Sequence, residues 1–150
     1  MKALNMYKKF TILPGGNWLF SKAVCLAAPY FGSIKPRFDE LRSNYCQVSL
    51  KKRWRVQNHL GTIHAIAMCN MAELAGGTMT DASVPKKARW IPSGMTVKYV
   101  KKANTDLIAV ADGIGLDWSV NGEVVVPVVV KDTQGTIVFT ADITMNIKQG

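Results

Sequence analysis

The stretch that decides the fold is NHLGTIHAIAMCNMAELAGG, residues 58–77. From Ile63 to Ala75 it is apolar almost all the way round, which predicts a buried helix. Thr62 stands where an N-cap belongs, and Gly76-Gly77 is expected to end the helix. A helix without a polar face has to be wrapped by a sheet or by a second subunit.

Strands are predicted on both sides of this helix. Residues 36–56 have the pattern of two strands with a turn at Ser43-Asn44. Four more strands are expected after the helix, at 88–102, 106–112, 123–131 and 136–147. Pro127 predicts that its strand lies at an edge or is bulged there. The sequence therefore predicts an α+β protein in which one long central helix is wrapped by a curved antiparallel sheet.

The N-terminal part has a different pattern. Residues 1–33 predict two short helices joined by a turn at Pro14-Gly15-Gly16, the second at about Trp18 to Ala28. We therefore expect a helical extension over residues 1–33 and one domain over residues 34–150, since a chain of 150 residues is long enough for a single core. No apolar run reaches the roughly 20 residues that a membrane-spanning helix needs.

The chain is strongly basic, with 19 Lys and Arg against 10 Asp and Glu and a formal charge of +9. Such a surplus indicates an anionic partner: nucleic acid, an anionic membrane face or a phosphate-bearing small molecule. Because no helix-turn-helix, zinc finger or RNP-like aromatic run is present, we expect no nucleic-acid partner. Because no apolar run is long enough to span a membrane, we expect no membrane partner either, which leaves the small molecule. Three cysteines in no CxxC pair and two histidines predict no metal site, and a reduced, cytoplasmic, soluble protein is expected.

Glu73 is the candidate catalytic residue that the sequence itself indicates. It is the only charged residue between His64 and Gly76. Burying a carboxylate without a partner is costly, and carboxyl groups placed in this way often act as general bases or nucleophiles. The alternative is that Glu73 bonds to a backbone group or lies at a solvated end of the helix.

The start of the helix offers the second half of a possible site. Backbone N–H groups near Ile63, His64 and Ala65 lack acceptors within the helix and could hold an oxyanion. Ala65 and Glu73 are eight residues apart, which is about 12 Å along a helix. One carbonyl cannot contact both, because reacting groups approach to about 3–3.5 Å. If both act in one reaction they come from two copies of the chain, so we expect a homodimer, with a dimer of dimers left open.

The run Asn58-x-x-Gly61-Thr62-x-His64, followed nine residues later by an acid, resembles the signature of PaaI-like acyl-CoA thioesterases of the hotdog fold. The segments at 95–103 and 128–144 agree with it, and the resemblance spans about residues 36–147. The sequence of residues 58–77 resembles even more closely that of an uncharacterised bacterial branch of that superfamily. The resemblance implies a hotdog fold with extra N-terminal helices, and a substrate that is a coenzyme A thioester, with no other cofactor.

The same resemblance implies roles for individual residues. Glu73 would be the catalytic carboxylate, attacking the thioester or activating a water. Ala65 would lend its N–H to the oxyanion hole, Asn58 would orient the water or the thioester, and His64 would set the geometry of the hole. We predict further substrate contacts at His59, Gly61 and Thr62. Separately from the resemblance, the basic clusters predict phosphate contacts at Arg89, Lys98 and Lys101, although a run of charges is more often a solvated face.

Two features keep other functions open. The family usually has two glycines where this chain has Ala65 and Ile66, and this crowding favours a non-catalytic acyl-CoA-binding or fatty-acyl-binding protein. His59 stands fourteen residues before Glu73, which matches the spacing in hotdog 3-hydroxyacyl-thioester dehydratases. The proline-rich stretch that those dehydratases have between the two residues is missing here. The acid is also more often Asp than Glu in the thioesterase family.

Overall fold

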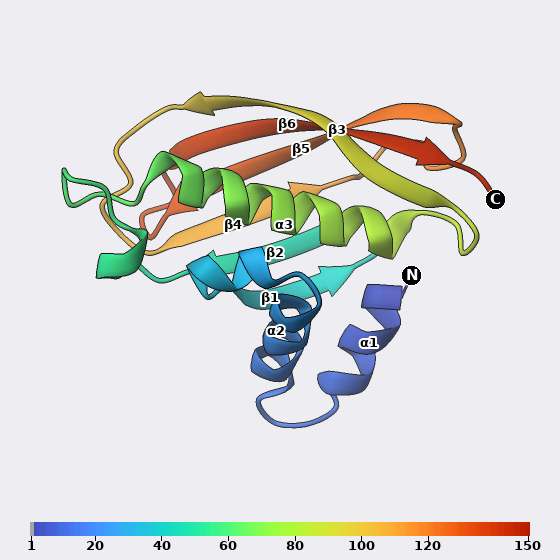
Figure 1. Cartoon of the computed structure of the whole chain (residues 1–150), viewed down its shortest axis with the longest axis horizontal. Coiled ribbons are helices and arrows are strands. Elements are labelled where there is room, and N and C mark those ends of the chain that lie inside the picture. Colours follow the sequence, from blue (N-terminus) through green and yellow to red (C-terminus); the bar gives the residue numbers. More distant parts are fainter. Residues whose placement is uncertain (1) are drawn as a thin grey trace.

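The computed structural model describes residues 2–150. Within them a six-stranded antiparallel sheet, in the order β1-β2-β4-β5-β6-β3, curves around one long helix, α3, Ala65–Ser83 (Figure 1). The predicted α+β architecture is therefore confirmed. The strands are β1 Arg37–Arg42, β2 Tyr45–Leu50, β3 Arg89–Tyr99, β4 Leu107–Asp112, β5 Gly122–Asp132 and β6 Ile137–Lys148.

Two helices precede the sheet, as predicted: α1 Lys2–Phe10 and α2 Gly16–Ala27. They form a hairpin that protrudes from the body and packs against β1 and α3 (Figure 1). Phe20 of α2 is fully buried, and its ring meets those of Tyr7 and Phe38 edge-on at 5.1 and 4.9 Å between centroids. Short 3-10 helices follow at η1 Pro29–Ile34 and η2 Trp54–Val56. The division into residues 1–33 and 34–150 stays a prediction.

The central helix differs from the prediction at both ends. Its N-cap is His64, whose Nδ1 accepts a hydrogen bond from the Ile66 N–H at 3.0 Å, and not Thr62. The helix also continues through Gly76-Gly77 to Ser83. A Cβ at Gly76 would lie 2.9 Å from Ile143 Cδ1, and one at Gly77 would lie 3.1 Å from the Trp90 ring. These glycines therefore allow the sheet to pack closely against the helix. They do not end the helix.

The Gly76→Val substitution is expected to lower the free energy of unfolding by about 1–3 kcal/mol, because it forces methyl groups into a packed interface. The added atoms would meet the side chains of Ile143, Val128 and Val126. Equilibrium denaturation in urea measures the effect. An unchanged midpoint and slope would contradict the packing of helix against sheet described here.

The expectation for Pro127 needs correction. Its strand, β5, is not an edge strand, since it lies between β4 and β6. The pairing of β4 with β5 ends where Ala111 faces Val128, so Pro127 lies just beyond the last pair on that side. The irregularity in β5 is between Val130 and Lys131, not at the proline. Proline is tolerated at this point because the β4 ladder no longer needs its N–H.

Strand β3 forms one edge of the sheet. It pairs with β6 on one side, and in residues 2–150 no strand pairs with its other side. Most of its side chains are exposed, including the apolar side chains of Ile91, Met95 and Tyr99. A long, apolar, unpaired edge is a template for another strand.

Candidate functional site

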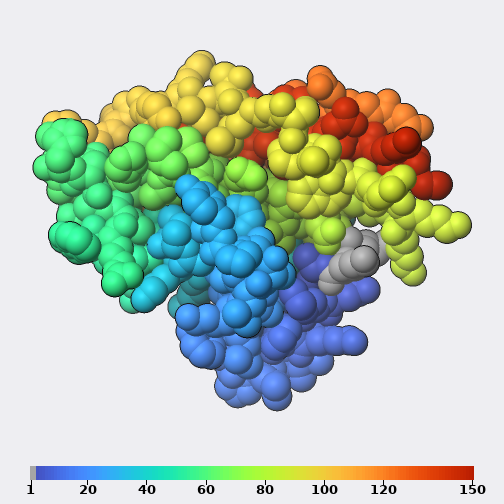
Figure 2. Space-filling model, viewed as in Figure 1, coloured from blue at the N-terminus to red at the C-terminus, as the bar shows by residue number. Residues whose placement is uncertain are grey.

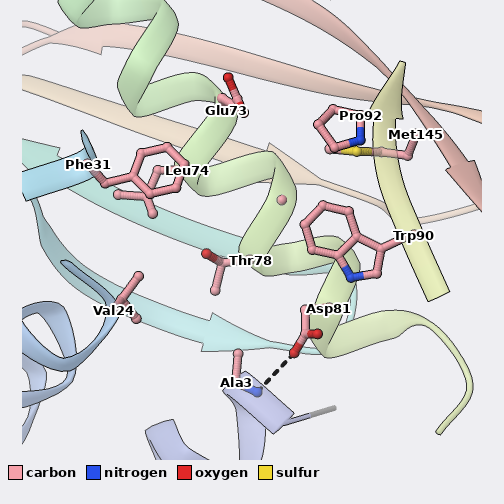
Figure 3. Close-up of a pocket in the computed structure, with 11 residues that line it drawn as sticks. Ala3, Val24, Phe31, Glu73, Leu74, Thr78, Asp81, Trp90, Pro92 and Met145 are labelled. Carbon is pink, nitrogen blue, oxygen red and sulfur yellow. Dashed lines mark hydrogen bonds between the residues drawn. The ribbon is translucent and has the colours of Figure 1, made fainter. Parts of the chain in front are cut away.

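An apolar pocket of about 250 Å³ lies along α3, between the N-terminal helices and β3 (Figure 3). One wall comes from α3, and the opposite side is closed by Trp90 and Pro92 of β3 and Met145 of β6. The N-terminal helices supply the remaining wall. The lining residues from α1, α2, η1 and α3 are Ala3, Val24, Phe31, Glu73, Leu74, Gly77, Thr78 and Asp81.

Glu73 lies at one end of this group of residues and Asp81 lies toward the other (Figure 3). The Glu73 side chain is partly buried, and no residue in the described chain lies within hydrogen-bond or ion-pair distance of its carboxylate. The alternative in which Glu73 bonds to a backbone group is therefore not what the structure has. Its carboxylate has no partner in the described residues, and in Figure 3 it points away from the other residues that line the pocket.

Asp81 is the other carboxylate of the pocket, and its position is structural. Its Oδ2 accepts a hydrogen bond from the Ala3 N–H at 2.9 Å. Ala3 lies in the first turn of α1, where a negative charge stabilises the helix because the N–H groups there are unsatisfied. Asp81 thus ties the N-terminal hairpin to α3 and fixes one wall of the pocket.

The start of α3 presents one backbone donor. The Ile66 N–H is taken by His64 Nδ1, and the Ala67 and Met68 N–H groups donate to the His64 carbonyl at 3.0 and 3.3 Å. For the Ala65 N–H, no acceptor lies within hydrogen-bond distance in residues 2–150. Capping by His64 therefore leaves this single N–H pointing out of the helix end.

The loop before α3 is closed by Asn58. Its Oδ1 accepts from the Leu60 and Thr62 N–H groups at 2.9 and 3.2 Å, and its Nδ2 donates to Thr62 Oγ1 at 2.9 Å. Gly61 turns the chain with φ of 71°, a conformation that favours glycine. His59 is exposed in this loop. The substrate contacts expected of His59, Gly61 and Thr62, and the orienting role of Asn58, stay predictions.

Within one chain the predicted catalytic groups do not meet. Ala65 and Glu73 both lie on α3, eight residues and about 12 Å apart. His59 lies in the loop before the helix begins. A site that uses the Glu73 carboxylate together with the Ala65 N–H needs a second copy of the chain.

The three predicted cationic ligands are also not gathered in one chain. Arg89 and Lys98 lie at the two ends of β3, nine residues or about 30 Å apart, and Lys101 follows the strand. All three are exposed. Arg89 lines a surface cavity of about 660 Å³ that shares Asp81 and Trp90 with the apolar pocket.

Some pocket residues were not predicted as site residues. Trp90 is one of them, because its contact with Gly77 joins two elements that are distant in sequence. Asn70 lies outside this pocket, in a separate surface cavity that His64 also lines, and was not predicted either. It is buried, and its Nδ2 lies 3.3 Å from Ser33 Oγ, while no donor in the described residues meets its Oδ1. The sequence feature that could have identified Asn70 is a single amide side chain on an otherwise apolar face of the helix.

In residues 2–150 no group of three or more His, Cys, Asp or Glu side chains is arranged to hold a metal ion. No helix in this part of the chain is long and apolar enough to cross a bilayer.

The fold is that of the hotdog thioesterases. A thioesterase from Haemophilus influenzae, HI1161, superposes with a TM-score of 0.71 at 8% identity, covering 80% of this chain and 82% of that one. A thioesterase family protein from Silicibacter pomeroyi superposes with a TM-score of 0.73 at 13% identity, covering 87% and 96%. At these identities the likeness shows the fold alone.

The chain belongs to the family described as a domain of unknown function, DUF4442, whose model matches residues 16–147. A structural-genomics protein, APC5556, is 49% identical over the whole of both chains, with a TM-score of 0.91. No functionally curated protein matches the sequence.

Proposed function

We propose that this protein hydrolyses acyl-CoA thioesters, with Glu73 as the catalytic carboxylate and the Ala65 N–H of a second copy as oxyanion donor. The observation that carries the proposal is the Glu73 carboxylate, which has no partner in the described chain and stands at the end of an apolar pocket. Carboxylates in apolar surroundings with a free approach suit general-base or nucleophilic chemistry.

The layout of α3 and β3 supports a shared site. Tyr99, at the end of β3, lies beside Cys69 near the helix start, with 3.7 Å between hydroxyl and sulfur. Trp90, at the beginning of β3, lies against Gly77. The two elements therefore run in opposite directions, side by side. If two copies of β3 pair antiparallel about a two-fold axis, the helix start of each copy lies beside the later part of its partner's helix.

Such pairing also explains the basic residues of β3. An antiparallel partner strand would bring Lys98 of one copy toward Arg89 of the other, although the two are about 30 Å apart within a chain. Together they would bind the phosphates of coenzyme A, for which Arg and Lys are the natural ligands.

We propose the following steps for the hydrolysis of the thioester by Glu73 and the Ala65 N–H. A water oxygen adds to the thioester carbonyl carbon while its proton passes to the Glu73 carboxylate, and the new oxyanion accepts a hydrogen bond from the Ala65 N–H. The C–S bond then breaks, and the thiolate of coenzyme A takes the proton from Glu73. Direct attack by Glu73 leads to the same products through an acyl anhydride that water hydrolyses.

The volume of the pocket indicates which acyl groups fit it best. A cavity of about 150 Å³ lined by aliphatic side chains holds benzene, with its six carbon atoms. By the same ratio a pocket of about 250 Å³ holds about ten carbon atoms. We therefore expect a medium-chain or single-ring aromatic acyl group.

A panel of acyl-CoAs from acetyl to palmitoyl, with phenylacetyl-CoA included, tests the function. We expect thiol release to be fastest for acyl groups of up to about ten carbon atoms and to fall for longer chains. Thermal shifts without thiol release from any member would instead show the non-catalytic binding protein that Ala65 and Ile66 favour. Formation of an enoyl thioester from a 3-hydroxyacyl-CoA would show the dehydratase.

A further inference from the structure

The tip of the N-terminal hairpin, residues 11–18, exposes large apolar side chains. Ile12 is 81% exposed, Leu13 59% and Trp18 58%. The tip is the most protruding part of the molecule in this view (Figure 2). Leu13 and Trp18 also line one shallow cavity, so they present a common apolar surface. A surface of this kind at a protruding tip marks a binding site for a partner.

The chain on both sides of the tip carries only positive charges as far as Asp39, whose backbone carbonyl accepts a hydrogen bond from Asn17 of the tip. Residues 1–38 contain six Lys and Arg and no Asp or Glu, so they carry most of the +9 charge of the chain. Lys8, Lys9 and Lys22 are exposed on the two helices that flank the tip. The ammonium group of Lys22 lies 5.5 Å from the centre of the Trp18 ring.

A groove of about 320 Å³ adjoins the tip, with Trp18 lining both. Five cationic side chains line this groove and no carboxylate does: Lys22, Lys35, Arg37, Lys51 and Arg53. We call it the cationic groove. Among these five, only Arg37 has an acidic partner in the described residues, Asp39, with 3.6 Å between Nε and Oδ1.

Arg53 is a cationic side chain of the groove with a donor that no described residue uses. Its Nη1 is buried and has no hydrogen-bond acceptor in residues 2–150, while its Nη2 donates to the Ser33 carbonyl at 3.4 Å. Burial, and then the neighbouring charge of Arg55, lower the pKa of this guanidinium. A phosphate oxygen in the groove would satisfy the donor and balance the charge.

We propose that the hairpin tip and the cationic groove dock this protein on an anionic phospholipid bilayer. The tip enters the headgroup region with Ile12, Leu13 and Trp18, and the groove holds lipid phosphates. Exposed aliphatic and tryptophan side chains beside lysines are the composition of interfacial membrane contacts. A bilayer fits better than an acidic protein, because the exposed aliphatic and tryptophan side chains stand at a protruding tip beside cationic side chains, the arrangement that an interfacial contact needs.

This docking differs from the expectation of no membrane partner, which rested on the absence of a spanning segment. An interfacial contact needs no such segment. It is also compatible with pairing through β3, since the hairpin packs against β1, the opposite edge of the sheet (Figure 1). Both copies of a dimer would keep their tips accessible.

Vesicle flotation with the whole protein tests the proposal. We expect flotation with phosphatidylcholine vesicles that contain about 30 mol% phosphatidylglycerol, less with phosphatidylcholine alone, and less again in about 0.5 M salt. The double variant Ile12→Ser, Leu13→Ser should bind about tenfold more weakly, because its apolar burial is lost. Lys22→Gln and Lys35→Gln should each weaken binding about fivefold.

Matched controls lie elsewhere on the surface. Ile114→Ser removes an apolar side chain that is 74% exposed between β4 and β5, and Lys86→Gln removes a charge between α3 and β3; neither should change flotation. Turnover of an acyl-CoA in solution should be unchanged in all these variants. No flotation with anionic vesicles would overturn the proposal. So would equal losses in the controls, a change of oligomeric state in the tip variants, or binding of duplex DNA in place of vesicles.

Discussion

The Glu73→Gln variant is expected to release thiol from the best acyl-CoA substrate about 10²–10⁴-fold more slowly than the natural protein, with the fold and the dimer intact. The amide has nearly the same shape as the carboxylate but cannot take a proton from water or attack a carbonyl. Because Glu73 has no partner in the described chain, its replacement breaks no interaction that holds the structure. Steady-state thiol release, with light scattering for the dimer, measures both.

Two further variants sharpen this result. Glu123→Gln changes an exposed glutamate on β5 and should leave turnover unchanged. Glu73→Asp keeps the charge but withdraws it by one methylene, so it should retain part of the activity. Turnover of Glu73→Gln at the natural rate would remove Glu73 from the mechanism, whatever the protein hydrolyses.

The Ala65→Pro variant should be almost as damaging to turnover, with a loss of about 10²–10³-fold in kcat. Proline removes only the backbone N–H that we propose as the oxyanion donor. The first position of a helix favours proline, and His64 before it has φ −62° and ψ 138°, a conformation that suits the residue preceding a proline. The free energy of unfolding should therefore stay the same or rise by about 0.4–1 kcal/mol.

The control for this variant is Ala65→Ser, which keeps the N–H and adds one oxygen atom. It should retain most of the activity if the backbone donor matters and the side chain does not. A loss of activity in Ala65→Pro that comes with a lower midpoint of unfolding would indicate helix damage, and unchanged activity would exclude the Ala65 N–H as the donor.

Much of the fold follows from local patterns in the sequence. The alternation of apolar residues predicts all six strands, and the apolar run after Ile63 predicts the central helix. The end of that helix could not be predicted, because two consecutive glycines usually stop a helix. Here Gly76 and Gly77 are required by Ile143 and Trp90, residues far away in the chain that pack against them.

Less of the candidate site could be predicted from the sequence. Glu73 stands out as the lone charge in an apolar helix, but the pocket beside it is built from six separate elements, including Val24 of α2 and Phe31 of η1. Their meeting depends on how the hairpin packs, which no local pattern encodes. The capping role of His64 is similar: Thr62 is the commoner N-cap residue, and its hydroxyl is instead occupied by Asn58.

The assembly of one site from two chains is tested most directly by mixing the two inactive variants. Glu73→Gln and Ala65→Pro protomers, unfolded and refolded together in equal amounts, should form mixed dimers in half of the cases, each with one complete site. The account predicts recovery of about a quarter of the natural turnover. If the mixture stays as inactive as either variant alone while light scattering and mass analysis confirm mixed dimers, Glu73 and Ala65 do not act together across a subunit interface.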